Sequence, residues 1–284
     1  MLIRRKYLYF IGVIAILGMC FIAGCEYTNQ NYIPVNNQIK PLNGVPILMY
    51  HKINPDRRSG GLGLRVPPQE FAWEMAYLKK NGYHTVDMGT VLNHYQNGAG
   101  IPKKPIIITF DDGYQDNYLY ALPILKKNGF TATVFVITNT IGGFNDFDLK
   151  AKIEPKNKMM NWSEIRAMDA NGITIGSHTL DHPHLTKITP SEAKRQIIES
   201  KKLLEKGLGK RVRYFCYPYG DVNPAIVQWV KESGYEAATT TKPGLASARL
   251  NPYLLNRIRI TGHFNHQIFI QQLNKYHAST KTFV

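Results

Sequence analysis

The chain has 284 residues, enough for one domain with a sizeable core, and its formal charge at pH 7 is +15. Such a charge favours anionic partners such as cell-wall polymers or acidic lipids, although diffuse charge can also serve solubility alone. The sequence has no arginine-rich block and no zinc-finger spacing, and its first residues, described below, resemble an export signal. We therefore expect no nucleic-acid partner.

The amino-terminal segment resembles a bacterial lipoprotein signal. Residues 4–6 are basic, and the apolar run 7–21 is too short for a comfortable membrane span. Residues 22–25 resemble a lipobox, so we expect a signal peptide at 1–24 and a lipid such as palmitate on Cys25. This predicts a protein held on the extracytoplasmic face of the cell membrane. An uncleaved signal anchor and a plain signal peptide are the alternatives.

The remaining amino-terminal residues predict a tether rather than a second domain. Residues 25–44 are polar, rich in Asn and Gln, and contain two prolines. Residues 45–284 then form a single folded domain. Loss of Cys20 with the signal leaves Cys25 and Cys216, and with Cys25 lipidated no intramolecular disulfide is expected.

From residue 45 onward, short apolar strands alternate with amphipathic helices. We expect strands at 45–50, 85–86, 106–110, 131–137, 173–177, 214–217, 237–240 and 255–260. We expect helices at 67–80, 88–95, 118–127, 162–170, 189–208, 224–232 and 266–273, with loops at 54–66 and 138–158. This alternation is typical of βα units and predicts an α/β fold, a deformed or incomplete (β/α) barrel.

Several of the predicted strands end in polar residues that carry chemistry. His51, Asp111 with Asp112, His178 and Tyr219 follow four different strands. The carboxyl ends of the strands share one face of a barrel, which is where active sites lie. The pattern therefore predicts one site built from these residues.

The strand at 106–110 runs directly into Asp111, Asp112 and Gly113. Gly113 permits a sharp turn, at which the two carboxylates can converge on one site. One could bind a metal while the other acts as a base. A solvated turn without function is the alternative, and the dipeptide alone does not decide between them.

A histidine pair supplies the decisive second group. His178 and His182 are four residues apart, which in a helical turn places both imidazoles on one face. Two histidines and one carboxylate, here Asp112, form a common catalytic zinc site, and Asp111 could take a proton from water. The pair alone is a weak signal, because surface helices carry such pairs, and His184 is a competing ligand.

Two motifs resemble the NodB-homology polysaccharide deacetylases, carbohydrate esterase family 4. They are Thr109 to Gly113 and His178 to His182, and the similarity covers about residues 105–262. The resemblance implies a deformed (β/α) barrel and metal-dependent removal of N- or O-acetyl groups from sugar polymers. It also implies that Asp111 is the general base, and that Asp112, His178 and His182 bind a divalent metal, usually zinc.

The third motif departs from the family. Cys216 stands where members usually carry an arginine that holds the base carboxylate, and Arg213 is out of register. Arg257 is our candidate for the missing positive charge, with an ordinary surface arginine as the alternative. The resemblance also predicts that the Tyr219 backbone N–H faces the oxyanion; a simple turn with a packed ring is the alternative.

The front of the domain resembles one branch of the family. Residues 48–51 are similar to a segment of the poly-N-acetylglucosamine deacetylases, in which the early histidine is the general acid. This implies that His51 protonates the leaving amine. His263 is the alternative candidate for the general acid. In that case His51 would only cap the end of a strand.

Together these features predict a lipid-anchored, metal-dependent enzyme that removes N-acetyl groups from an extracellular polysaccharide. Peptidoglycan and poly-N-acetylglucosamine-like polymers are the expected partners, and the sequence does not choose between them. An O-acetyl esterase and a catalytically weak glycan-binding protein remain as alternatives. The physiological metal and the oligomeric state are not predicted.

Overall fold

The computed structural model describes residues 42 and 44–278, except 152, 153 and 250. The predicted signal peptide, Cys25 and nearly all of the predicted tether lie outside these residues. In the part of the chain that is described, every helix is too short or too polar to cross a membrane.

Seven parallel strands close into a barrel. Their order is β1-β5-β6-β7-β8-β9-β10, and β10 pairs again with β1. The strands are β1 (Ile47–Tyr50), β5 (Pro105–Phe110), β6 (Thr133–Val136), β7 (Thr174–Ser177), β8 (Tyr214–Cys216), β9 (Ala237–Pro243) and β10 (Leu255–Arg259). β4 (His84–Thr85) pairs with the start of β5, and β2 (Lys52–Ile53) pairs separately with β3 (Arg65–Val66). The predicted (β/α) barrel is confirmed.

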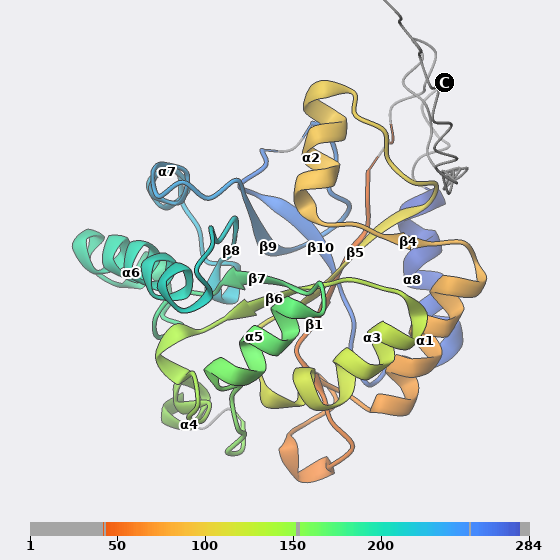
Figure 1. Ribbon diagram of the computed structural model, residues 1–284, viewed down its shortest axis with the longest axis horizontal. Coiled ribbons are helices and arrows are strands. Elements are labelled where there is room, and N and C mark those ends of the chain that lie inside the picture. Colours follow the sequence, from red (N-terminus) through yellow and green to blue (C-terminus); the bar gives the residue numbers. More distant parts are fainter. Residues whose placement is uncertain (1–41, 43, 152–153, 250, 279–284) are drawn as a thin grey trace, which may run out of the picture. The chain divides into compact units, whose positions relative to one another are not determined.

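Helices surround these strands (Figure 1). They are α1 (Pro68–Lys80), α2 (Met88–Asn97), α3 (Leu122–Asn128), α4 (Asp146–Ala151), α5 (Trp162–Ala170), α6 (Pro190–Leu208), α7 (Pro224–Glu232) and α8 (His266–Ala278). Short helical turns are η1 (Arg57–Ser59), η2 (Asn117–Ala121), η3 (Thr138–Thr140), η4 (Leu185–Lys187) and η5 (Pro218–Gly220). Several helices begin after a residue whose side chain caps the first turn. At α5, Asn161 and Glu164 form a reciprocal capping box, in which each side chain accepts a hydrogen bond from the backbone N–H of the other.

Side chains along β5 point alternately to the two faces of the strand and belong to two different apolar clusters. Ile106, Ile108 and Phe110 belong to the large apolar cluster that includes the helices. Ile107 belongs instead to the smaller cluster that fills the barrel, together with Phe135 and Tyr214. The next residues on the inward face are Thr109 and Asp111, so the barrel interior changes from apolar to polar toward the carboxyl ends.

Two segments predicted as loops contain regular structure. Residues 138–158 include η3 and α4, and residues 54–66 include η1 and β3. These elements are too short to show a hydrophobic period. Contacts from elsewhere hold them instead: Asp148 of α4 accepts a hydrogen bond of 2.8 Å from the Tyr114 hydroxyl, and the buried Asn157 side chain donates to Ser59 O at 3.0 Å. The helix predicted at 118–127 begins with the π-helical turn η2 and continues as α3.

Candidate active site

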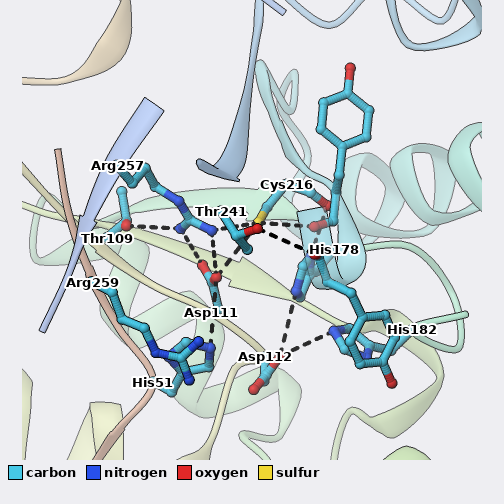
Figure 2. A network of polar contacts seen from close by, with 12 residues as sticks. His51, Thr109, Asp111, Asp112, His178, His182, Cys216, Thr241, Arg257 and Arg259 are labelled. Carbon is cyan, nitrogen blue, oxygen red and sulfur yellow. Dashed lines mark hydrogen bonds and ion pairs between the residues drawn. The ribbon is translucent and has the colours of Figure 1, made fainter. Parts of the chain in front are cut away.

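The polar residues predicted at strand ends meet at the carboxyl end of the barrel (Figure 2). His51 follows β1, Asp111 and Asp112 follow β5, and His178 follows β7. Cys216 lies on β8, which neighbours β7, and Arg257 lies on β10, which neighbours β1. The site is therefore assembled by strand pairing from segments that are far apart in the sequence.

Arg257 holds Asp111 in a bidentate ion pair. Its two terminal nitrogens donate to the two carboxylate oxygens at 2.7 Å each, and both residues are buried. The same guanidinium donates to Thr109 Oγ1, to Thr240 O and to the Cys216 sulfur at 3.2 Å. Burial alone would raise the pKa of Asp111, but the charge and hydrogen bonds of Arg257 outweigh it and hold that pKa well below its usual range. Asp111 is therefore an oriented carboxylate at neutral pH.

His51 lies on the other side of Asp111. Its Nε2 atom is 3.9 Å from Asp111 Oδ2, and its backbone carbonyl accepts a hydrogen bond of 2.8 Å from Asn117 Nδ2. Burial lowers the pKa of His51, although the carboxylates of Asp112 and Asp111 oppose this by raising it. His51 and Asp111 are thus close enough for one small polar group to contact both side chains.

Asp112 points away from Arg257 because the chain turns sharply after β5. Asp112 has φ 74° and Gly113 has φ 86°, both in the left-handed region. A Cβ atom on Gly113 would lie 3.3 Å from a Val136 methyl, so glycine fits this turn with least strain. The turn directs Asp112 Oδ1 toward His178 Nε2 at 3.5 Å and His182 Nε2 at 3.6 Å.

The two histidines converge, but not by the predicted helical turn. Residues 178–182 form no helix, and Thr179 and His182 adopt φ values of 71° and 59°. The His182 N–H donates to Thr179 Oγ1 at 3.0 Å, and Gln196 Oε1 on α6 accepts from two further backbone N–H groups of the loop. The prediction of a helical turn was wrong because tertiary hydrogen bonds hold this loop.

The arrangement of Asp112, His178 and His182 fits a divalent metal. Their ligand atoms all lie within 4.8 Å of one another, and separations of 3.5 and 3.6 Å are long for hydrogen bonds. Tetrahedral zinc with bonds of about 2.1 Å places its ligand atoms about 3.4 Å apart, close to these values. His178 Nδ1 lies 2.8 Å from Cys216 O, the hydrogen bond that directs the opposite nitrogen to a metal.

Two further observations support this set of ligands. Burial lowers the pKa of His182 to about 3, so that the His182 imidazole is in the neutral form that binds metals. Asp111, His178 and Cys216 form a second possible group. However, both oxygens of Asp111 are already engaged by Arg257, so we assign the site to the group containing Asp112.

Tyr219 borders the metal ligands through both its backbone and its ring. Its φ of 59° lies in the left-handed region, and no group in the described part of the chain accepts a hydrogen bond from its N–H. Its ring packs on His182 at 4.5 Å between centroids and stacks on His184 at 3.9 Å. His184 is anchored by Asp221, with 2.7 Å between Nδ1 and Oδ2.

Comparison with known proteins identifies the family. Residues 99–238 match the family model described as polysaccharide deacetylase. The chain is 35% identical over 217 residues to YxkH of Bacillus subtilis (strain 168), whose name places it provisionally among the polysaccharide deacetylases, covering 76% of this chain and 71% of that protein. The chain belongs to the polysaccharide deacetylase family.

Other members of the family resemble this deacetylase over most of its length. A poly-β-1,6-N-acetyl-D-glucosamine N-deacetylase of Staphylococcus epidermidis is 26% identical over 269 residues, covering 89% of this chain and 92% of the relative. The structure of the Streptococcus pyogenes deacetylase PplD in complex with acetate has a TM-score of 0.70 at 30% identity, covering 82% and 99% of the two chains.

The structure of this deacetylase also shows where the alternative residues considered from the sequence lie. Arg257 is fully buried and contacts Asp111, so it is not a surface arginine. His51 is the histidine that lies near Asp111, whereas His263 is exposed and lines a groove after β10. Arg213 binds Asp87 and Glu236 rather than the site.

Sequence reasoning missed three neighbours of the site. Phe147 packs on His182 at 4.8 Å, Asn117 holds the His51 carbonyl, and Arg259 lies beside His51 (Figure 2). Phe147 falls in a segment without a recognisable pattern. Arg259 could have been found, because it stands two positions after Arg257 on a predicted strand and therefore on the same face.

Proposed function

We propose that this deacetylase hydrolyses N-acetyl groups of an amino-sugar polysaccharide outside the cell, with the help of a divalent metal, which we expect to be zinc. The observation that carries the proposal is the pair of adjacent carboxylates with different partners. Asp111 is held by Arg257, whereas Asp112 faces two imidazoles. One carboxylate is thus kept for proton transfer and the other for metal binding.

Asp112, His178 and His182 would hold the metal. When bound there, a divalent ion polarises the acetyl carbonyl and lowers the pKa of water. Asp111 takes the proton of the water that attacks the carbonyl carbon. Arg257 keeps Asp111 ionised and fixes the direction in which its oxygens face.

His51 is our candidate for the general acid. It lies 3.9 Å from Asp111 on the side away from Arg257, and gives its proton to the leaving nitrogen as the carbon–nitrogen bond breaks. The products are acetate and the free amine. Burial lowers the pKa of His51 and so makes its protonated form a stronger acid, while the charges of Asp112 and Asp111 oppose this lowering.

The Tyr219 N–H is our candidate for oxyanion stabilisation. Its conformation leaves that N–H without an acceptor in the described residues, next to the ligand His182. A preorganised donor of this kind stabilises the negative charge that develops on the carbonyl oxygen.

Two observations favour an N-acetylated glycan as substrate. Relatives across most of the chain are named poly-β-1,6-N-acetyl-D-glucosamine N-deacetylases. His51 also lies where a leaving nitrogen needs an acid, since an amine is a poorer leaving group than an alcohol. Peptidoglycan remains a second candidate polymer, because it presents the same acetamide.

We also propose that Cys25 carries a lipid and holds the enzyme on the extracytoplasmic face of the membrane. This rests on the basic start, the apolar run and the lipobox-like residues 22–25. Metabolic labelling with a palmitate analogue tests it: the label should enter the wild-type chain and be lost in Cys25→Ala. Labelling that persists in Cys25→Ala would contradict this assignment.

The catalytic proposal is tested by measuring acetate released from N-acetylglucosamine oligomers and from peptidoglycan by the full-length chain. Release should stop after chelation, return with zinc, and be absent in Asp111→Asn. Release that survives thorough chelation would refute metal dependence. Release from O-acetylated xylan but from neither amino-sugar polymer would favour the esterase instead.

A further inference from the structure

Arg259 stands at the mouth of the barrel, next to the reacting groups. Residues two apart on a strand share a face, so Arg259 follows Arg257 along the inward side of β10. Arg257 reaches Asp111 deep in the barrel, whereas Arg259 is exposed and lies beside His51 (Figure 2). The catalytic roles proposed above leave Arg259 without a function.

The Arg259 guanidinium has no acidic partner among the described residues. It donates one long hydrogen bond of 3.4 Å from Nη2 to Gly63 O. Among the described residues, no carboxylate lies within 4.0 Å of it, in contrast to Arg257 with Asp111 and Arg213 with Asp87. An exposed guanidinium with open donors is able to bind an anion in a bidentate manner.

The loop that contacts Arg259 also forms one wall of a groove of about 1100 Å³. Residues 57–65 form that wall and residues 262–267 form another, joined by a hydrogen bond of 2.8 Å from Gly262 N to Leu62 O. The groove is therefore linked to Arg259 through the loop that carries Gly63, although Arg259 is not among the residues that line it.

The charge of this groove is positive. Its lining includes the guanidinium groups of Arg57 and Arg65, and its acid, Glu70, is paired with His266 at 3.2 Å. Arg65 donates to backbone carbonyls, whereas the exposed Arg57 has no acidic side chain within 4.0 Å in the described part of the chain. Arg57 and Arg259 are thus two exposed guanidinium groups: Arg57 lines the groove, and Arg259 contacts the loop that forms one of its walls.

We infer that Arg259 and the groove bind an anionic substituent of the glycan, a phosphate or a carboxylate, close to the acetamide that reacts. This inference rests on the proposed function, because it names the class of glycan that the same site accepts. A neutral glycan would be bound by mixed donors and acceptors and by aromatic rings. The two guanidinium groups offer donors only, together with a positive charge.

The test compares three oligosaccharides of equal length. One is a neutral N-acetylglucosamine oligomer, the second carries the lactyl carboxylates of muramic acid, and the third carries phosphate monoesters. We expect the full-length chain with zinc to show a kcat/KM about tenfold higher on at least one anionic oligomer than on the neutral one, at low salt. High salt should reduce this preference, since it screens exposed charges. The two anionic arms distinguish carboxylate from phosphate recognition.

Variants then assign the preference to Arg259. Arg259→Gln should reduce the ratio of anionic to neutral kcat/KM about tenfold, and Arg259→Lys should retain part of it. Arg57→Gln should reduce the ratio less. Arg211→Gln is the matched control, because this exposed arginine precedes β8 at the opposite end of the barrel and should leave the ratio unchanged.

Equal rates on all three oligomers would overturn the inference while leaving the proposed deacetylase function intact. An equal loss on all three in Arg259→Gln would also overturn it, by indicating a general role. If no oligomer releases acetate, the proposed function fails on these substrates, and calorimetric binding by the chelated enzyme decides the inference. Tighter binding of an anionic oligomer would support it, and equal binding would refute it.

Discussion

The two ends of the barrel contain similar residues in different arrangements. At the amino end, Arg213 pairs with Asp87 and Glu236, and the Tyr214 hydroxyl donates to Asp87 at 2.8 Å. The three charged groups are partly exposed, Tyr214 is buried, and the four satisfy one another. At the carboxyl end, Arg257 and Asp111 are buried, and the neighbouring histidines lie 3.5 to 3.9 Å from the carboxylates, too far for good hydrogen bonds.

The backbone shows the same contrast. Five non-glycine residues of the described chain have positive φ, and four of them, Asp112, Thr179, His182 and Tyr219, lie in the active site. Backbone in this region is costly and persists where the surrounding structure enforces it. The amino end pairs its polar groups with one another, whereas the carboxyl end holds its polar groups apart, as the proposed binding of a metal, a water molecule and a substrate requires.

We expect the largest effect from replacing the proposed general base at the carboxyl end of the barrel. Asp111→Asn should lower kcat/KM for acetate release by about 10³- to 10⁴-fold, because the amide cannot take a proton from water. Asp87→Asn is the matched change at the amino end and should alter kcat/KM less than about twofold, since Asn still caps α2. Circular dichroism must show both variants folded. Similar losses in the two variants would contradict the assignment.

The two arginines should differ in their contribution to stability. Arg257→Met leaves Asp111 as a buried carboxylate without its partner and should lower the free energy of unfolding by about 3–5 kcal/mol. Arg213→Met removes a partly exposed ion pair and should cost about 1 kcal/mol or less. Urea denaturation measures both, and equal losses would show that the buried pair is not special.

The general acid is tested by exchanging two histidines separately. His51→Gln should lower kcat by about 10²- to 10³-fold, because the leaving nitrogen then departs without a proton donor. His263→Gln should have a much smaller effect on a neutral oligomer, because His263 is exposed in the loop after β10. A larger loss in His263→Gln would reverse the assignment.

A smaller effect concerns the helical layer outside the barrel. Glu74 on α1 is buried and accepts a hydrogen bond of 2.8 Å from the Tyr50 hydroxyl, and burial raises its pKa from 4.5 to about 8. A raised folded-state pKa gives stability that is fully present below about pH 4.5 and is lost as pH rises through about 8. Asp111, whose pKa is lowered, acts in the opposite direction and loses its contribution as pH falls.

Glu74→Gln should therefore flatten the pH dependence between pH 5 and 8, by about 2–4 kcal/mol in the free energy of unfolding. Denaturant titrations of wild type and variant at several pH values measure this difference. Parallel curves across this range would show that Glu74 ionises normally in the folded state. Tyr50→Phe controls for the loss of the hydrogen bond alone.

The sequence alone predicted the barrel and the residues of the candidate site. Regular alternation of strands and helices is a local property, so hydrophobic periods and Asn-Gly stops predicted the elements within a few residues. Asp111, Asp112 and His178 could be proposed as site residues because they follow strands directly, and the carboxyl ends of parallel strands meet. His182 could be proposed from its spacing of four residues from His178. The short elements α4 and β3 escaped prediction because contacts with distant segments hold them.

Only the tertiary structure decided how the site is held together. Whether Arg257 faces Asp111 or solvent depends on the register of β10 against its neighbours, which no local pattern specifies. The convergence of His178 and His182 likewise depends on a loop held by Gln196 from α6, not on the helical turn that their spacing indicates. Local residues thus specify which groups follow each strand, and long-range packing specifies which of these groups meet.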